Sequence, residues 1–186
     1  SHIAAIVDVV VSEDSTVYDI GSNWGWLSLL VASKPGFKGQ IHAFEPYAPS
    51  FMDLQAVVSQ SQLGSRIQCH NLALSDEEGK VRMRLPDSFQ SGQAAIENAT
   101  DANGDTKATT VDALKLPPPT LMKIDVEGAE ARVFGGAKIT LATHKPMIVF
   151  ESGRRDDNPI ETLKPLKLLE SLGYRFFHLS WLRSQA

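Results

Sequence analysis

Four acidic residues stand at or directly after the ends of apolar, β-branched segments of the chain. They are Asp19, Glu45, Asp125 and Glu151. In an open α/β sheet, the carboxyl ends of the parallel strands meet at one edge, and ligands bind there. A carboxylate at the end of a buried strand is costly unless something satisfies it. We therefore expect this edge to bind a ligand that offers hydrogen-bond donors or positive charge.

A glycine-containing loop follows the first of these carboxylates. It reads DIGSNWGW over residues 19–26, and its glycines would let backbone amides approach a ligand at the start of a helix. The spacing is G-x-N-x-G, which does not meet the G-x-G-x-x-G fingerprint for a pyrophosphate. Asp19 at the mouth of the loop would repel a diphosphate and attract a cation. S-adenosylmethionine carries a sulfonium and an ammonium, and its carboxylate could use the loop amides.

Glu45 follows the second predicted strand and suits the ribose of a nucleoside. A carboxylate in this position can accept both hydrogen bonds of a ribose diol. NAD carries the same diol, so Glu45 supports a nucleoside cofactor without choosing between NAD and S-adenosylmethionine. The loop spacing and Asp19 favour S-adenosylmethionine.

Alternating strand and helix patterns predict the elements that position these residues. Buried strands are predicted over residues 16–20, 40–44, 66–72, 121–126, 147–150 and 174–179. Helices are predicted around Leu27 to Val31, from Pro49 to Gly64, from about Glu127 with a break at Gly135-Gly136, and with Pro165 in a first turn. This order predicts an α/β fold with a mostly parallel, doubly wound sheet and helices on both faces.

The middle of the chain departs from this alternation. Val81, Met83 and Leu85 alternate with two arginines, which predicts an exposed antiparallel strand. Residues 86–106 are rich in Ser, Gln, Asn, Asp and Gly and predict a surface insertion. The insertion is either a loop or a lid over the site.

Five segments, in this order, resemble the FkbM family of S-adenosylmethionine-dependent methyltransferases. They read DIGSNWG (19–25), FEP (44–46), NLALSD (71–76), TVDAL (110–114) and KIDVEGAE (123–130), and the last is the most specific. The resemblance runs from about residue 15 to 152. It implies a class I methyltransferase (Rossmann-like) fold and methyl transfer, usually to a hydroxyl oxygen of a sugar, polyketide or other small metabolite.

The resemblance also implies roles for individual residues. The methionine part of the cofactor would be lined by Asp19, Gly21, Ser22, Asn23 and Gly25, the ribose would be held by Glu45, and the adenine would lie near Asn71, Ala73 and Leu74. Trp24 and Trp26 are bulkier than the residues expected in this loop. A complete fold of this class ends in an antiparallel strand pair, whereas only residues 174–179 predict a strand here. Either the last strand is missing or the sheet is completed differently.

Three carboxylates are candidates for the chemistry of methyl transfer. The reaction is an in-line displacement, and an alcohol acceptor must lose its proton to a nearby base. Asp125, Glu127 and Glu151 are the candidate bases, and Asp125 could instead hold the cofactor's ammonium. Glu127 and Glu130 could also simply stabilise a helix start. Shared solvation explains this acidic cluster better than a bound Mg²⁺ or Ca²⁺, so we expect no metal.

The histidines and the cysteine suggest no further chemistry. His42 and His70 fall within strand patterns and are expected to be structural, as is Cys69. His144 and His178 are near enough to predicted strand ends to approach the site, but a catalytic role is not favoured.

Composition narrows the remaining classes of function. The chain has 186 residues, which predicts one domain over residues 1–186, and its net charge of −4 favours neither nucleic acid nor anionic lipid as a partner. Cys69 is its only cysteine, and no apolar run is long enough to cross a bilayer, so a cytoplasmic protein is expected. The predicted acceptor is a small molecule or glycan. The alternatives are an NAD-dependent oxidoreductase and a non-catalytic cofactor-binding domain.

Overall fold

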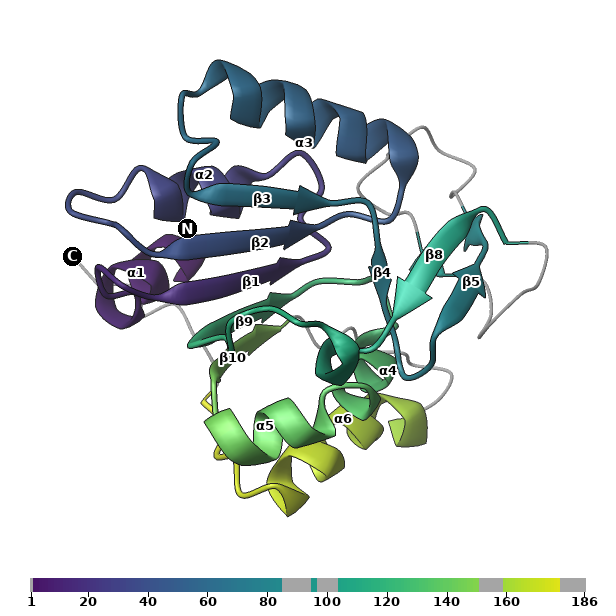
Figure 1. The fold of residues 1–186 in the computed structure, drawn as a ribbon. Coiled ribbons are helices and arrows are strands. Elements are labelled where there is room, and N and C mark those ends of the chain that lie inside the picture. The colour runs from purple at the N-terminus through teal and green to yellow at the C-terminus, as the bar shows by residue number, and fades with distance from the viewer. Residues whose placement is uncertain (1, 85–94, 97–103, 151–158, 178–186) are drawn as a thin grey trace, which may run out of the picture.

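Five parallel strands form the centre of the molecule (Figure 1). The computed structural model describes residues 2–84, 95–96, 104–150 and 159–177. The strands are β1 (Thr16–Ile20), β2 (Gln40–Phe44), β3 (Ile67–His70), β9 (Leu121–Ile124) and β10 (Met147–Phe150), in the spatial order β10-β9-β1-β2-β3. Since β1 lies between β2 and β9, the strand order reverses beside it, and the loop after β1 lies at the switch point where such sheets bind ligands.

Helices cover both faces of this sheet, as the sequence predicts (Figure 1). One face carries α1 (His2–Val10), α2 (Trp26–Ala32) and α3 (Ala48–Gln60), and the other carries α4 (Glu130–Gly135), α5 (Lys138–His144) and α6 (Pro159–Ser171). Alternation along β1 builds both cores, because Val17 packs with the first group of helices and Tyr18 with the second. The predicted doubly wound architecture is confirmed.

A smaller sheet stands beyond the carboxyl ends of β1 to β3 (Figure 1). It consists of β4 (Ala73–Leu74), β8 (Thr106–Thr109) and β5 (Gly79–Val81), and a separate pair is formed by β6 (Met83–Arg84) and β7 (Ala95–Ile96). The prediction of one exposed strand over residues 81–85 is therefore wrong. Val81 is buried against β8, whereas Met83 pairs with Ile96, so the strand is divided because its two halves have different partners. Most of the predicted insertion, and Leu85, lie outside the described residues.

Three boundaries on the α4–α6 side differ from prediction. The helix expected from Glu127 begins at Glu130, because Glu127 and Gly128 have φ angles of 49° and 98° and cannot continue a right-handed helix. Pro165 lies inside α6 rather than in its first turn. Residues 174–177 are not a strand in the structure, and the rest of the strand predicted there lies outside the described residues. The predicted break at Gly135-Gly136 is confirmed, since α4 ends at Gly135.

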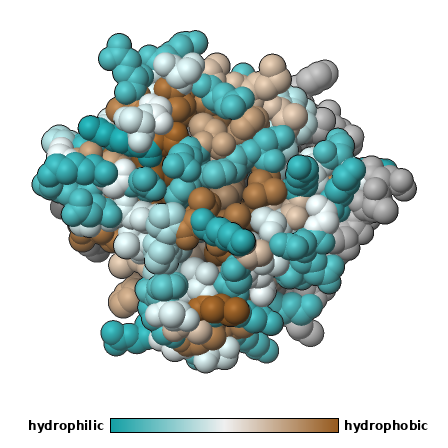
Figure 2. Space-filling model, viewed as in Figure 1, coloured by the Kyte–Doolittle hydropathy of each residue, from teal (hydrophilic) through white to brown (hydrophobic). Residues whose placement is uncertain are grey.

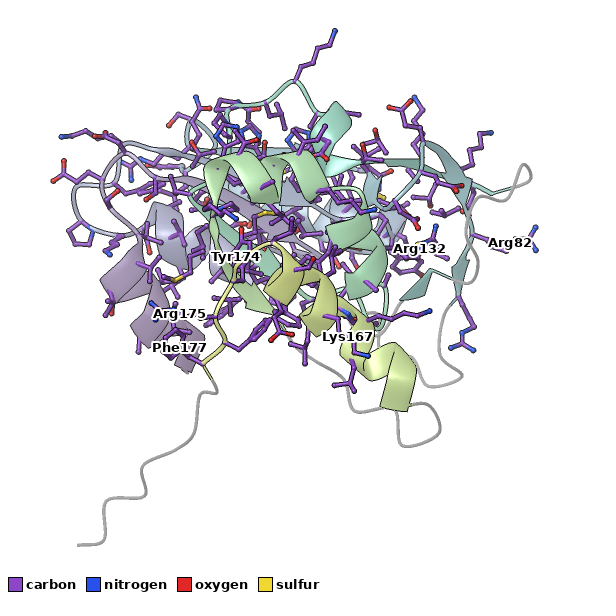
Figure 3. The ribbon with its side chains drawn as sticks, turned by 90° about the horizontal axis from the view of Figure 1, so that it is seen from below. Arg82, Arg132, Lys167, Tyr174, Arg175 and Phe177 are labelled. Atoms are coloured by element: carbon purple, nitrogen blue, oxygen red, sulfur yellow. The ribbon has the colours of Figure 1, made fainter. Side chains whose placement is uncertain are left out.

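Hydrophilic and apolar side chains are mixed on the surface of the molecule (Figure 2). Figure 2 shows hydrophilic side chains spread over one face, with apolar side chains between them. Viewed from the α6 side, the segment after α6 carries Tyr174, Arg175 and Phe177 (Figure 3). The Tyr174 hydroxyl donates to the backbone oxygen of Leu141, which holds this segment against α5.

None of the described helices is long and apolar enough to cross a bilayer.

The TVDAL segment, one of the five that resemble the FkbM family, contacts the start of α5. Within the TVDAL segment, the two carboxylate oxygens of Asp112 accept hydrogen bonds from the backbone N–H groups of Ile139 and Thr140, both at 2.8 Å. These amides belong to the first turn of α5, where a helix has no partners of its own for its N–H groups. Asp112 thus caps α5 from a distant part of the chain.

Replacing Asp112 with alanine is expected to lower the free energy of unfolding by about 1 to 2 kcal/mol, since capping carboxylates contribute about this much. Denaturant unfolding followed by circular dichroism measures the loss. Asp112→Asn keeps one acceptor oxygen and should lose about half as much. Equal stability of Asp112→Ala and the parent protein would contradict the capping role.

Candidate functional site

The loop after β1 is fixed between the ends of its two neighbouring strands. The backbone N–H groups of Gly21 and Ser22 both donate to the carbonyl oxygen of Phe44 at 3.0 Å, at the end of β2. Gly21 has a φ of 73°, and a Cβ atom there would lie 1.9 Å from the carbonyl oxygen of Asp125, at the end of β9. Only glycine fits this position, so the loop closely follows the carboxyl edge of the sheet.

Gly25 is the residue that precedes the first turn of α2. Its φ is 90°, its N–H donates to the oxygen of Ser22 at 2.8 Å, and a Cβ atom would meet Leu54 at 2.5 Å. Gly25 is not among the residues that line either of the two pockets described below. Its place in the motif follows from backbone conformation and from packing against α3.

Glu45 is held in place by two backbone amides. Its Oε2 accepts from the N–H of Asn23 at 2.8 Å, and its Oε1 accepts from the N–H of Tyr47 at 2.9 Å. The residue is only 7% exposed, and burial raises the pKa of its carboxyl group, although the two backbone hydrogen bonds act in the opposite direction. Each oxygen keeps a further lone pair for a ligand hydroxyl.

Asn71 binds the backbone of Glu45 and of the residue after it. Its side-chain Nδ2 donates to the backbone oxygens of Glu45 and Pro46, at 2.9 Å and 3.1 Å. Asn71 does not line the pocket beside Glu45, whereas Ala73 and Leu74 do. The structure therefore gives Asn71 a supporting contact with the strand end.

Asp19 and Asp125 meet at a lysine that the sequence reasoning missed. Lys123 is the register partner of Asp19 on the adjacent strand, and its Nζ lies 3.4 Å from Asp19 Oδ1 and 3.5 Å from Asp125 Oδ2. The same Nζ donates to the backbone oxygen of Gly21 at 2.7 Å. Asp19 is fully buried and also accepts from the hydroxyl of Ser28 at 2.7 Å, while the side chain of Asp125 is 44% exposed.

The position of Lys123 within an apolar segment could have identified it from the sequence. A charged residue inside a buried strand, two positions before Asp125, must lie on the same face as that carboxylate. Its ion pair with Asp19 depends on the register of two strands that are far apart in the chain, and the sequence pattern does not give that register.

Two neighbouring pockets open at this edge of the sheet. The first is lined by Ile20, Gly21, Asn23, Phe44, Glu45, Pro46, Leu72, Ala73, Leu74, Met83, Asp125, Val126 and Glu127. The second is lined by Asp19, Gly21, Ser22, Asn23, Trp24, Trp26, Leu27, Lys123 and Asp125. They share Gly21, Asn23 and Asp125, so they adjoin: the first combines apolar residues with Glu45, Asp125 and Glu127, and the second contains Asp19, Lys123 and Asp125.

This site brings together most of the predicted residues. Asp19, Gly21, Ser22, Asn23, Glu45, Ala73, Leu74, Asp125 and Glu127 all line one of the two pockets. Glu151 lies outside the described residues. Met83 joins the site from the region that was predicted as an exposed strand, and Trp24 and Trp26 keep exposed rings beside the second pocket.

Glu127 and Glu130 have different surroundings. Glu127 has a φ of 49° and lines the first pocket, so it does not belong to the helix whose start it was expected to stabilise. Glu130 opens α4, and its carboxylate accepts from the backbone N–H of Gly128 at 3.0 Å. Within the described part of the chain, no group of three or more His, Cys, Asp or Glu residues is arranged to hold a metal ion.

His42 and His70, on the neighbouring strands β2 and β3, contact each other next to Phe44. The His42 Nδ1 and His70 Nε2 atoms are 3.2 Å apart, and the His70 ring stacks on Phe44, which lines the first pocket. Burial, together with the neighbouring His70, lowers the pKa of His42 to about 4, and burial also lowers the pKa of His70. His144 is exposed at the end of α5, before the amino end of β10, and so lies away from the site.

This pair predicts a loss of stability in mild acid. The unfolded chain binds a proton on each histidine below about pH 6.5, whereas folded His42 resists protonation down to about pH 4. The free energy of unfolding is therefore retained above pH 6.5 and falls as the pH drops toward 4. Between pH 7 and pH 5, the titration of His42 alone should lower the free energy of unfolding by about 2 kcal/mol. Denaturant unfolding at each pH measures this.

His42→Asn provides the comparison, because the same titration then lacks this group. The difference between the two proteins cancels the effect of Glu45, whose raised pKa acts in the opposite direction. Parallel stability curves for the two proteins would contradict the prediction.

Comparisons with known proteins agree with this architecture. A structure titled methyltransferase FkbM from Methylobacillus flagellatus KT has a TM-score of 0.62 at 20% identity, covering 87% of this chain and 37% of that one. A precorrin-6y C5,15-methyltransferase from Geobacter metallireducens GS-15 has a TM-score of 0.56 at 14% identity, with coverage of 93% and 70%. A SAM-dependent O-methyltransferase from Thermotoga maritima has a TM-score of 0.52 at 10% identity, with coverage of 91% and 49%.

These likenesses show a class I, Rossmann-like methyltransferase fold. This chain spans less than half the length of the Methylobacillus protein. No curated protein matches the sequence. The model of the methyltransferase FkbM domain matches residues 19–176, which include the loop after β1, Glu45 and the Lys123 to Glu130 segment. The chain therefore belongs to the FkbM methyltransferase domain family.

Proposed function

We propose that this domain uses S-adenosylmethionine to methylate a hydroxyl oxygen on a small molecule or glycan. The observation that carries the proposal is the position of Glu45. Two backbone amides hold its carboxylate at the end of β2, it lines the first pocket, and it lies beside the tight loop after β1. Membership of a methyltransferase family supports the transfer of a methyl group.

The residues present fit this cofactor. The free lone pairs of Glu45 suit the two hydroxyls of a ribose. Phe44, Ala73 and Leu74 give the first pocket an apolar wall that suits a flat base. The half-exposed carboxylate of Asp125 is available for an ammonium group. When bound, S-adenosylmethionine supplies a methyl group on a positively charged sulfur, which is the electrophile of the reaction.

Asp125 and Glu127 are the candidate bases. Both line the first pocket at the end of β9. In the proposed mechanism, one of these carboxylates accepts the proton of the acceptor hydroxyl as its oxygen bonds to the methyl carbon. Most of the rate enhancement would come from holding the acceptor oxygen in line with the bond that breaks. Glu151 remains a predicted third candidate.

The acidic residues of the site support an acceptor other than nucleic acid. Three carboxylates, those of Glu45, Asp125 and Glu127, line the first pocket and would repel a polyanion. In Figure 3, Arg82 lies beside the small sheet, well apart from Lys167 of α6 and from Arg175 after that helix. Binding to a nucleic-acid backbone requires contacts from many basic side chains together.

Binding and transfer are tested in turn. Calorimetry should show binding of S-adenosylhomocysteine and much weaker binding of NADH, and the reverse order would favour the oxidoreductase alternative. Incubation with S-adenosylmethionine labelled on the methyl group, and with alcohols, sugars, peptides and RNA, should transfer label to a hydroxyl compound. Cofactor binding without transfer to any of them would favour a non-catalytic domain, and transfer to RNA would overturn the proposed acceptor class.

Asp125→Asn and Glu127→Gln separate the two candidate bases. If Glu127 is the base, Glu127→Gln should lower the rate of methyl transfer while its affinity for S-adenosylhomocysteine stays near that of the parent protein. Asp125→Asn should also weaken binding of S-adenosylhomocysteine, because Asp125 is the proposed contact for the ammonium group, so its rate of transfer is compared at saturating S-adenosylmethionine. Unchanged turnover in both variants would remove both residues from the proton transfer.

A further inference from the structure

Lys123 is the cation at the centre of the site. Its Nζ contacts three parts of the carboxyl edge at once: the oxygen of Gly21 in the loop, the carboxylate of Asp19 in β1 and the carboxylate of Asp125 after β9. Its side chain is 12% exposed, and the residue lines the second pocket. The contacts with the two carboxylates are 3.4 Å and 3.5 Å long, longer than ordinary charged hydrogen bonds, so the ammonium keeps capacity for a closer partner.

Asp19 is a buried carboxylate beside Lys123. It is 0% exposed and lines the second pocket; its Oδ2 accepts from the Ser28 hydroxyl, whereas its Oδ1 makes no hydrogen bond to a described residue and lies 3.4 Å from Lys123 Nζ. A buried carboxylate of this kind must be compensated by a nearby positive charge. Lys123 is the positive charge beside it, with Nζ 3.4 Å from Oδ1, and both residues line the second pocket.

A buried hydroxyl in the same pocket also lacks a partner. Ser22 is 5% exposed, and its Oγ makes no hydrogen bond to any described residue. Ser22 and Lys123 both line the second pocket. A buried hydroxyl without a partner costs free energy unless a ligand satisfies it. A hydroxyl and an ammonium together suit an anionic oxygen group such as a carboxylate.

We propose that Lys123, with Ser22, binds the carboxylate of the methionine part of S-adenosylmethionine. Asp19 is then a positioning residue that acts through Lys123 and does not touch the cofactor. This inference rests on the proposed function, and it differs from the sequence expectation that Asp19 itself attracts the cofactor's positive charge. It leaves Asp125 as the exposed carboxylate for the ammonium group of the same ligand.

A pair of ligands tests the assignment by calorimetry. S-adenosylhomocysteine carries the amino-acid carboxylate, whereas 5′-methylthioadenosine keeps the nucleoside and sulfur but lacks it. Lys123→Met should weaken binding of S-adenosylhomocysteine by about 10- to 100-fold, as expected for a lost charged hydrogen bond. Its affinity for 5′-methylthioadenosine should change by less than about threefold. Equal losses for both ligands would mean that Lys123 only supports the fold of the site.

Lys123→Met leaves the buried carboxylate of Asp19 without its positive partner, and the variant could unfold for that reason. Two further variants keep the test decisive in that case. The double variant Asp19→Asn/Lys123→Met removes both charges, and it should show the same selective loss of S-adenosylhomocysteine binding. Asp19→Asn alone keeps Lys123 but removes the charge that positions it, so it should show a smaller loss than Lys123→Met, again for S-adenosylhomocysteine and not for 5′-methylthioadenosine. A much larger loss in Asp19→Asn, with Lys123→Met unaffected, would reassign the contact to Asp19.

Lys115→Met is the matched control, since it removes an exposed lysine outside both pockets and should leave both affinities unchanged. If the parent protein binds neither ligand, the proposed function itself fails, and this assignment fails with it. Binding of both ligands by the parent protein with no selective loss in the variants overturns the assignment alone.

Discussion

Replacing Glu45 with glutamine is expected to weaken binding of S-adenosylhomocysteine by at least about 100-fold at pH 7. The carboxylate accepts one backbone hydrogen bond on each oxygen, from Asn23 and Tyr47, and has one more lone pair on each for the ribose diol. Glutamine has one acceptor oxygen, and its NH₂ group would face a backbone N–H. The variant thus loses a charged hydrogen bond to ribose and disturbs the strand end, which together account for about 3 kcal/mol or more.

The pH dependence of binding gives an independent check on Glu45. Burial raises the pKa of its carboxyl group above the usual 4.5, so protonation begins at a higher pH than for an exposed glutamate. A protonated carboxyl group accepts fewer hydrogen bonds, and cofactor affinity should therefore fall as the pH drops through this raised pKa. Calorimetry in a series of buffers measures the fall, which should be much weaker in Glu45→Gln.

Glu170→Gln serves as the control, because Glu170 is an exposed residue of α6 that lines neither pocket. It should bind the ligand as the parent protein does. Binding by Glu45→Gln within about threefold of the parent value would show that the ribose does not lie on this carboxylate.

The parallel sheet could be predicted from the sequence because its pattern is local. β1, β2 and β10 have the predicted bounds, since each is a short apolar run that ends at a loop or a carboxylate. The break between α4 and α5 was also predictable, because two consecutive glycines interrupt the pattern. These features depend on residues within a few positions of one another.

The features that could not be predicted depend on partners far away in the chain. Val81 and Met83 are two positions apart, yet they pair with β8 and β7, and local alternation does not show that division. The α4 boundary depends on the left-handed conformation of Glu127, which the sequence favours only weakly.

The same distinction applies to the site. Its carboxylates were predictable because each lies at the end of an apolar strand. The pairing of Asp19 with Lys123 was not, because it follows from the register of β1 and β9. That pairing changes the interpretation of the site, since the most buried carboxylate lies beside a lysine, whereas Glu45 and Asp125 line the first pocket.

Replacing Gly21 with alanine is expected to destabilise the fold by about 3 kcal/mol or more. A φ of 73° alone costs a non-glycine residue about 1 to 2 kcal/mol. A Cβ atom would also lie 1.9 Å from the carbonyl oxygen of Asp125, and that oxygen is backbone, so either β9 or the loop must move. Movement at either place disturbs both pockets, because Gly21 and Asp125 line both of them.

Gly64→Ala provides a matched comparison for this substitution. The nearest atom to a Cβ at Gly64 is a Val58 side-chain carbon at 3.9 Å, which is an ordinary contact. Alanine there should leave stability unchanged or raise it slightly, by reducing the freedom of the unfolded chain. Denaturant unfolding of both variants measures the difference, and calorimetry should show that Gly21→Ala also loses most of its affinity for S-adenosylhomocysteine. If Gly21→Ala were as stable as Gly64→Ala and bound the ligand normally, the close approach of this loop to the carbonyl oxygen of Asp125 would be disproved.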